Sequence, residues 1–296
     1  MTTVPAHVDY GVLSARLRAM DGPLIRTCAA ALALVVLLAI VGPMIAPWEH
    51  DQIDWDHIGE SPSPQHWFGT DTAGRDLFVR TLTGARVSLG VAVLATLVTL
   101  VIGVPWGAVA GYVGGRLDLA MMRFVDVLYA LPFVFVVILL VVVFGRNLYL
   151  LFVALGALSW LDLARIVRGQ TLALRHETFV AAAQCQGAPP AYVIRRHIVP
   201  NLTGPALVYA TLTVPGVMLA ESFLSFLGLG VQEPDTSWGV LISEGAREME
   251  SSPWLLVFPA TFLAVTLCSL NVLGEALRDA LDPRHVTVRG PRPGNL

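Results

Sequence analysis

Residues 176–201, HETFVAAAQCQGAPPAYVIRRHIVPN, decide the fold of this chain. In this polar, basic stretch Thr178 suits the N-cap of a short helix, and Gly187 suits a left-handed C-cap. Pro189 or Pro190 suits the first turn of a second helix. Apolar segments long enough to cross a bilayer lie on both sides. Two short helices in such a loop indicate either a docking surface for a cytoplasmic partner or an amphipathic connector on the membrane surface.

The composition is that of a membrane protein with several spans. The 296 residues are 55% hydrophobic and 14% charged, and their mean hydropathy is +0.67. Soluble domains normally carry about 25% charged residues. We therefore expect an all-α membrane protein.

All 19 basic residues are arginine. Without lysine the chain has neither a P-loop lysine nor a Schiff-base lysine, so another chain must hydrolyse any ATP that drives it. No catalytic signature and no metal-ligand spacing stands out, and the three cysteines lack C-x-x-C spacing. We accordingly expect no catalytic, cofactor-binding or metal-binding residue in this chain, and no nucleic-acid partner.

Six apolar segments predict six transmembrane helices, because a bilayer core of about 30 Å needs about 20 helical residues. They are residues 24–46, 88–111, 121–144, 148–165, 204–227 and 253–274. The fourth is the weakest, since Trp160 and Asp162 crowd its end. Pro132 is expected to bend the third, and Pro105 the second.

The distribution of arginine predicts the orientation. With both termini inside, the arginines that fall outside are Arg75, Arg80, Arg86, Arg146 and Arg247, and the rest of the 19 are inside. The predicted parts are a cytoplasmic segment 1–23, a six-span domain 24–284 and a cytoplasmic tail 285–296. Within the domain lie outer loops 48–87 and 228–252 and a cytoplasmic loop 166–203.

Several motifs are typical of one transporter family. They are GTD at 69–71, GRD at 74–76, GARVSL at 84–89, AGYVGG at 110–115, Trp160 with ARIVRGQ at 164–170, ESFLSFLGLG at 221–230, SWG at 237–239 and LRDALDP at 277–283. From about residue 60 to 284 the chain resembles the C-type permease subunit of oligopeptide and dipeptide ABC importers. The run SWLDLAR at 159–165 is most similar to oligopeptide members.

The resemblance implies a type I ABC importer permease fold in a bacterial inner membrane. It also implies that the loop at 177–201 is a coupling loop that contacts an ATPase. The expected partners are a second permease subunit, one or two ATP-binding subunits that hold ATP and Mg²⁺, and an extracytoplasmic peptide-binding protein. The residues expected to couple to the ATPase are Phe179, Ala181, Ala182, Ala183, Gly187, Ala188, Pro189 and Pro190.

One position departs from the family pattern. The coupling loop usually has glutamate before the paired alanines, and this chain has Ala181 there. The change removes a charge-assisted contact to the ATPase. Glu177, about one helical turn earlier, is a candidate to replace that carboxylate.

Other polar and small residues in the spans have two interpretations. One set lines the translocation path or meets the second permease, and its members are Glu221, Ser222 and Ser225. The glycine repeat that includes Gly107 and Gly111 either packs within the chain or joins the interface with the second permease. The rival functions are a nickel or antimicrobial-peptide importer and a gradient-driven secondary transporter. A gradient-driven transporter predicts an inverted repeat and several buried acidic residues. The sequence has no evident repeat and few acidic residues in its apolar segments.

Overall fold

The computed structural model describes residues 22–145 and 148–281. The predicted tail 285–296 and nearly all of the predicted segment 1–23 lie outside the described residues. In the described ranges the regular structure is helical, with two isolated β-bridges. The elements are α2 (Pro23–Ile45), α3 (Leu77–Val113), α4 (Gly115–Tyr129), α5 (Phe133–Phe144), α6 (Leu148–Leu174), α7 (Thr178–Cys185), α8 (Pro190–Val193), η1 (Ile194–Ile198, a π-helical turn), α9 (Val199–Phe226), α10 (Trp238–Arg247) and α11 (Trp254–Leu281).

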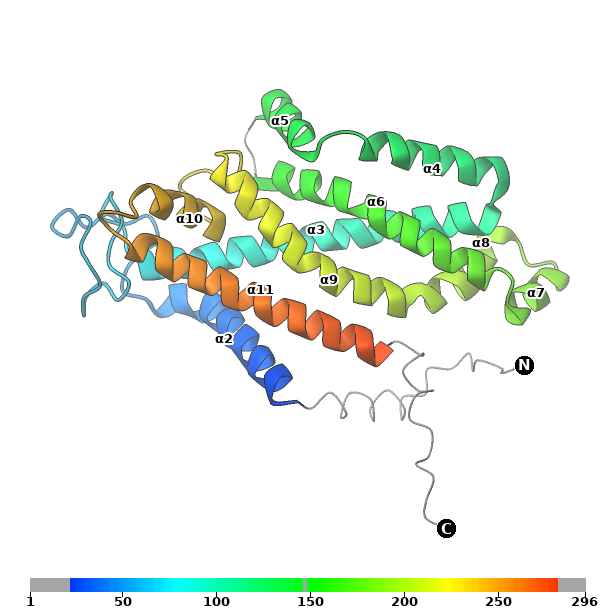
Figure 1. The fold of residues 1–296 in the computed structure, drawn as a ribbon, viewed down its shortest axis with the longest axis horizontal. Coiled ribbons are helices and arrows are strands. Elements are labelled where there is room, and N and C mark those ends of the chain that lie inside the picture. Colours follow the sequence, from blue (N-terminus) through cyan, green and yellow to red (C-terminus); the bar gives the residue numbers. More distant parts are fainter. Residues whose placement is uncertain (1–21, 146–147, 282–296) are drawn as a thin grey trace, which may run out of the picture.

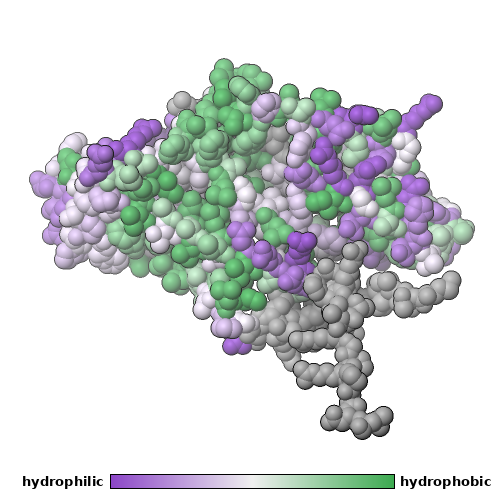
Figure 2. Space-filling model, viewed as in Figure 1, coloured by the Kyte–Doolittle hydropathy of each residue, from purple (hydrophilic) through white to green (hydrophobic). Residues whose placement is uncertain are grey.

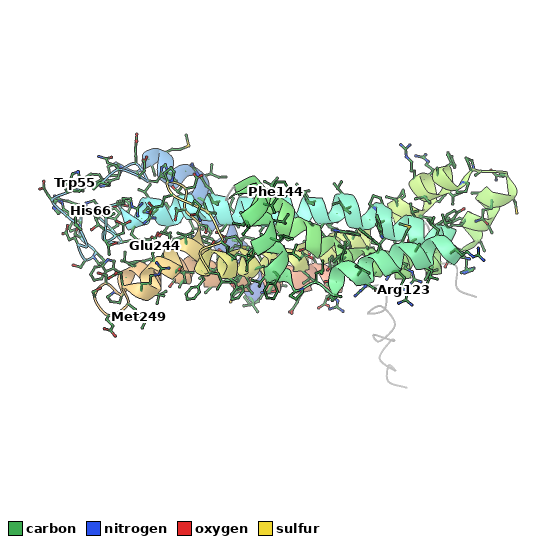
Figure 3. All side chains as sticks on the ribbon, turned by 90° about the horizontal axis from the view of Figure 1, so that it is seen from above. Trp55, His66, Arg123, Phe144, Glu244 and Met249 are labelled. Atoms are coloured by element: carbon green, nitrogen blue, oxygen red, sulfur yellow. The ribbon has the colours of Figure 1, made fainter. Side chains whose placement is uncertain are left out.

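The long helices α2, α3, α6, α9 and α11 run along the long axis of the molecule (Figure 1). One end carries α10 and the loop segment 46–76, which together we term the cap. The opposite end carries α7 and α8. Figure 3 shows the same division, with Trp55, His66 and Glu244 at the cap and Arg123 toward the other end.

A helix lies over each of the six predicted spans. Among the described residues, four helices are by themselves long and apolar enough to cross a membrane: α2, α3, α9 with its preceding turns, and α11. A fifth span results if α4 and α5 count as one broken span, bent by 81°. The break falls between Tyr129 and Phe133, next to Pro132, as the sequence predicts. The count of six spans therefore stays a prediction.

The hydropathy of the surface differs between the middle of the molecule and its two ends. Hydrophobic residues gather in a broad band across the middle of the face shown in Figure 2, and hydrophilic residues gather toward both ends. Many large apolar side chains are exposed on the isolated chain, among them Leu37, Val142 and Phe223. Helix α3 has 37 residues and at 1.5 Å per residue is about 55 Å long. It is therefore long enough to extend beyond the hydrocarbon core toward both ends.

The glycine repeat of α3 packs against α6. A Cβ atom on Gly103 would lie 3.0 Å from the carbonyl oxygen of Trp160, on Gly107 2.4 Å from that of Ala164, and on Gly111 2.7 Å from that of Arg168. Only glycine permits this approach of two helix backbones. Packing within the chain thus accounts for the repeat.

Candidate functional site

The predicted coupling loop forms two helices joined by a tight turn. Helix α7 begins at Thr178, so Glu177 and not Thr178 occupies the N-cap, and its side chain makes no capping hydrogen bond. After the helix, Gly187 has φ +80°. Its N–H donates to the carbonyl of Gln184 at 2.9 Å, and the N–H of Ala188 donates to that of Ala183 at 3.1 Å. These bonds form a Schellman motif, which ends α7 at the predicted glycine.

The second helix begins where the prolines predict. Pro189 is the N-cap and Pro190 is the first residue of α8. The helix continues through η1 into α9, so α9 extends from the coupling loop without a turn. Val193 and Ile198 are fully buried, whereas Arg195 and Arg196 are exposed.

An apolar cluster fixes both short helices to the bundle. Val180 and Ala183 of α7 pack with Val193 of α8 and with Leu163 and Val167 of α6. On the surface, Gln184 Nε2 donates to the hydroxyl of Tyr112 at 3.0 Å, which ties α7 to the end of α3. The loop is therefore a packed extension of α3, α6 and α9.

The predicted coupling residues divide by burial. Ala183 is buried, and Phe179 and Ala188 are half-buried. The exposed members are Ala181, Ala182, Gly187, Pro189 and Pro190. They form a surface of small side chains at the end of the molecule, where a partner backbone can approach closely.

Glu221 is fully buried inside the bundle. Its carboxylate accepts hydrogen bonds from Ser88 of α3 at 3.2 Å and from Ser225, one turn along α9, at 2.8 Å. Ser222 is half-buried, and its hydroxyl oxygen has no hydrogen-bond partner among the described residues. In the isolated chain, the bond from Ser88 to Glu221 thus joins α3 to α9, and Gly107 and Gly111 lie against α6.

Ion pairs join the cap to the helices. Asp71 binds Arg75 at 2.8 Å and also Arg80, whose side chain is 2% exposed. Arg80 continues to Glu244 of α10 at 3.0 Å. Arg75 reaches Glu233, in the segment between α9 and α10, also at 3.0 Å. The GTD and GRD motifs therefore build the connection between the two predicted outer loops.

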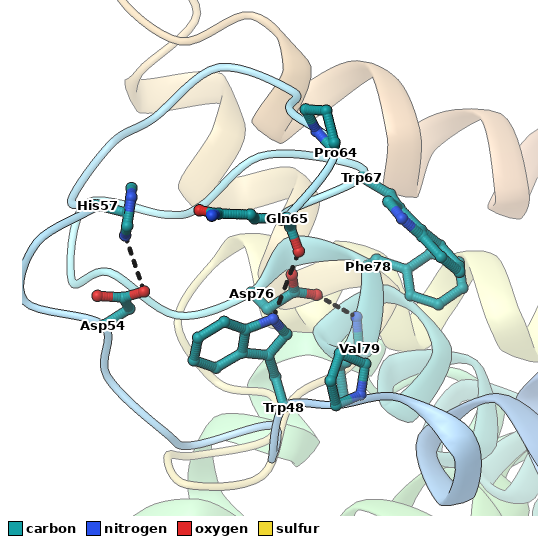
Figure 4. A pocket seen from close by; sticks show the side chains of 10 residues that line it. Trp48, Asp54, His57, Pro64, Gln65, Trp67, Asp76, Phe78 and Val79 are labelled. Carbon is teal, nitrogen blue, oxygen red and sulfur yellow. Dashed lines mark hydrogen bonds and ion pairs between the residues drawn. The ribbon is translucent and has the colours of Figure 1, made fainter.

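A second polar cluster lies beside a pocket of about 500 Å³ in the cap (Figure 4). Oxygen and nitrogen atoms of Asp54, His57 and His66 lie within 4.8 Å of one another, a grouping suited to a metal ion. The hydrogen bond between Asp54 and His57 lowers the pKa of the carboxyl and raises that of the imidazole. The sequence predicts no metal site, because the separation of His57 and His66 along the chain matches no metal-ligand spacing; only the fold brings them together.

The comparisons identify the family. A family described as binding-protein-dependent transport system inner membrane component matches residues 103–286. The chain belongs to this family. It is 52% identical over 255 residues to the oligopeptide transport system permease protein OppC of Haemophilus influenzae, covering 86% of this chain and 82% of that protein. OppC of Escherichia coli K12 is 51% identical, with 86% and 84% covered. The dipeptide permease DppC of Bacillus subtilis is 47% identical over 254 residues, with 86% and 79% covered.

A solved structure supports the fold assignment. The inward-facing MetNI methionine ABC transporter is similar at a TM-score of 0.54 and 17% identity, covering 70% of this chain and 96% of that one. At this identity the similarity concerns the fold alone. The family predicted from the sequence motifs is confirmed, and so is an all-helical permease of the type I ABC importer fold.

Proposed function

We propose that this chain is a transmembrane subunit of an ATP-driven peptide importer. It contributes half of a translocation pore and couples through residues 177–201 to a separate ATPase chain. The observation that carries the proposal is 52% and 51% identity, over 86% of the chain, to two oligopeptide permease proteins. The dipeptide permease at 47% identity supports the same substrate class.

The geometry of the coupling loop supports a mechanical role. A partner that pushes on the exposed face at Ala181 and Ala182 pushes on a unit whose other face is packed against α6. The helix that begins at Pro190 continues into α9, so displacement of the loop moves a long helix with it. Coupling of this kind requires a rigid element with two arrangements, as in alternating access.

The same proposal includes the partners and the orientation. The second permease covers apolar helix surface that the isolated chain exposes. The coupling loop lies on the cytoplasmic side, and the cap faces the extracytoplasmic binding protein. ATP and Mg²⁺ belong to the ATPase, in keeping with a chain that has no lysine. The chain itself carries out no catalysis.

Uptake by cells tests the substrate class. Deletion of this chain should abolish uptake of labelled tetrapeptides and dipeptides, and the wild-type chain should restore it. Normal peptide uptake in the deletion strain, with loss of nickel uptake instead, would refute a peptide importer. Purification of the tagged chain from its own membranes should recover an ATPase and a second permease, whereas a gradient-driven transporter would be recovered without an ATPase.

Substitution of Gly187 tests the coupling loop. No atom lies within 4 Å of a Cβ built on Gly187, so a side chain has room, but φ +80° strains residues other than glycine. Leucine there should cost about 1–2 kcal/mol of local stability and reduce both ATPase co-purification and uptake. Gly187→Asn is the matched control, because asparagine tolerates this conformation. Equal, normal uptake by both variants would remove the assignment of the loop.

A further inference from the structure

The polar cluster of the cap contains a histidine with one unused ring nitrogen. His66 is 1% exposed and stacks on Trp48, with ring centroids 4.7 Å apart. Its Nδ1 is 2.8 Å from the Asp76 carboxylate, which acts as the acceptor of the Nδ1 proton. Its Nε2 then carries a lone pair and has no hydrogen-bond partner among the described residues.

Two further ligand atoms surround that nitrogen. Asp54 Oδ2 lies 3.5 Å from His66 Nε2 and 2.9 Å from His57 Nδ1. Zinc in a tetrahedral site is about 2.0–2.1 Å from nitrogen and oxygen ligands, which places the ligands about 3.3 Å from each other. The two observed separations lie on either side of that value. Small movements of the half-buried Asp54 and His57 side chains toward His66 suffice to bring all three atoms to bonding distance.

Each histidine also has a carboxylate close to the ring nitrogen that would not bind the metal. Asp76 orients His66, and Glu60 Oε2 lies 3.8 Å from His57 Nε2. Glu60 Oε2 is buried and, within the described residues, has no hydrogen-bond partner. A histidine that binds a metal usually donates its other ring N–H to a carboxylate in this way. When His57 Nδ1 binds a metal, its proton resides on Nε2, where Glu60 can accept it.

The loop backbone holds these residues in place. The N–H of Asp54 donates to the carbonyl of Gly74 at 2.8 Å. Gly74 has φ +80°, and a Cβ there would lie 2.4 Å from the carbonyl oxygen of Asp54. Asp76 also caps α3 by accepting from the N–H of Val79 at 2.9 Å. The three candidate ligands are thus fixed to the first turn of α3.

A purely hydrogen-bonded cluster explains only part of this arrangement. It accounts for the contact of His57 with Asp54 and for that of His66 with Asp76. It leaves two buried polar atoms of the described residues, His66 Nε2 and Glu60 Oε2, without hydrogen-bond partners, and such atoms cost free energy. A bound cation would give His66 Nε2 a direct bonding partner. It would also give Glu60 Oε2 a hydrogen-bond donor, because the proton of His57 would then reside on Nε2.

We propose that Asp54, His57 and His66 bind one zinc ion at the cap. The set of two imidazoles and one carboxylate suits zinc, and the fourth position is left for water from the adjoining pocket, which Asp54 and His57 help to line. The ion joins residues separated by up to 12 positions in the segment between α2 and α3. It therefore cross-links the surface that the proposed binding protein would meet, although the metal site does not depend on that function.

Competition with a chromogenic chelator tests the site. The full-length chain, purified with a histidine-free tag and stripped of metal, should take up one zinc ion per chain. His57→Ala should weaken binding by more than 100-fold, and Glu60→Gln by roughly 10-fold, in the usual range for an outer partner. His50→Ala is the matched control, because His50 lies in the same segment but outside the cluster, and it should bind zinc as the wild type does.

The outcomes separate a built site from adventitious binding. Thermal unfolding without zinc checks that the His57 and Glu60 variants are folded, and zinc should raise the unfolding temperature of the wild type but not of His57→Ala. X-ray absorption should show nitrogen and oxygen neighbours at about 2.0–2.1 Å. Absence of saturable binding, sulfur neighbours, or equal affinity in wild type and His57→Ala would each overturn the proposal.

Discussion

Replacement of Gly107 by alanine should separate helix propensity from helix packing. Alanine favours a helix over glycine by about 1 kcal/mol. At Gly107, however, the new Cβ would lie 2.4 Å from the carbonyl oxygen of Ala164, 2.8 Å from Val167 Cβ and 2.9 Å from the backbone nitrogen of Arg168. Two of these are backbone atoms that no rotamer change can move, so α3 and α6 must separate locally.

The matched control is Gly90→Ala in the same helix, where no atom lies within 4 Å of the new Cβ. Because propensity contributes equally to both variants, their difference isolates the overpacking, about 1–3 kcal/mol. Gly107→Ala should then be destabilised by up to about 2 kcal/mol, and Gly90→Ala should be neutral or stabilised by up to 1 kcal/mol.

Equilibrium unfolding of the full-length chain by SDS in mixed micelles, followed by circular dichroism, measures both free energies of unfolding. Equal stability of the two variants within about 0.5 kcal/mol would refute the reasoning, because 0.5 kcal/mol lies below the range expected for overpacking. Greater destabilisation by Gly90→Ala would mean that the close contact of α3 is on the face that carries Gly90 and not on the face that carries Gly107.

Four further changes test the interior and the cap. Arg80→Met removes a buried cation from Asp71 and Glu244 and should cost about 3 kcal/mol in the same unfolding assay. Glu233→Gln removes the exposed partner of a different arginine, Arg75, and should cost less than about 1 kcal/mol. Ser237→Ala removes the side chain that caps α10 by accepting from Val240, and should cost about 1 kcal/mol. Glu221→Gln should lower stability by about 1–2 kcal/mol, because a carboxylate acceptor of two serine hydroxyls is replaced by a group that also donates; unchanged stability with lost uptake would instead favour a role in the path.

Local signals in the sequence predict much of the fold. The apolar segments predict where the long helices lie. Helix α2 agrees with its predicted span within one residue at each end, whereas α11 begins one residue later than predicted and ends seven residues later. Gly187 predicts the C-terminal end of α7, because glycine readily adopts a positive φ. Pro190 predicts the start of α8, because proline lacks the N–H that the first turn of a helix leaves unbonded. Thr178 failed as an N-cap because the choice between adjacent positions depends on how the chain enters the helix.

Contacts between distant residues could not be predicted in the same way. The repeat at Gly103, Gly107 and Gly111 indicates close packing but does not name its partner, and the structure identifies α6. Glu221 could be called buried from its apolar neighbours, yet Ser88, 133 positions earlier, supplies one of its hydrogen bonds. Hydropathy has no information on such pairs, because it is a property of each residue alone.

The sequence by itself determined the helical class, the family and the two breaks of the coupling loop, because each rests on local composition or on a contiguous motif. The tertiary structure decided which helices meet, that Ala181 and Ala182 face outward, and that Asp54, His57 and His66 share one site. The physical reason is that an irregular loop has no periodicity from which side-chain directions can be derived. Its hydrogen bonds and its packing on α3 set those directions only once the whole chain has folded.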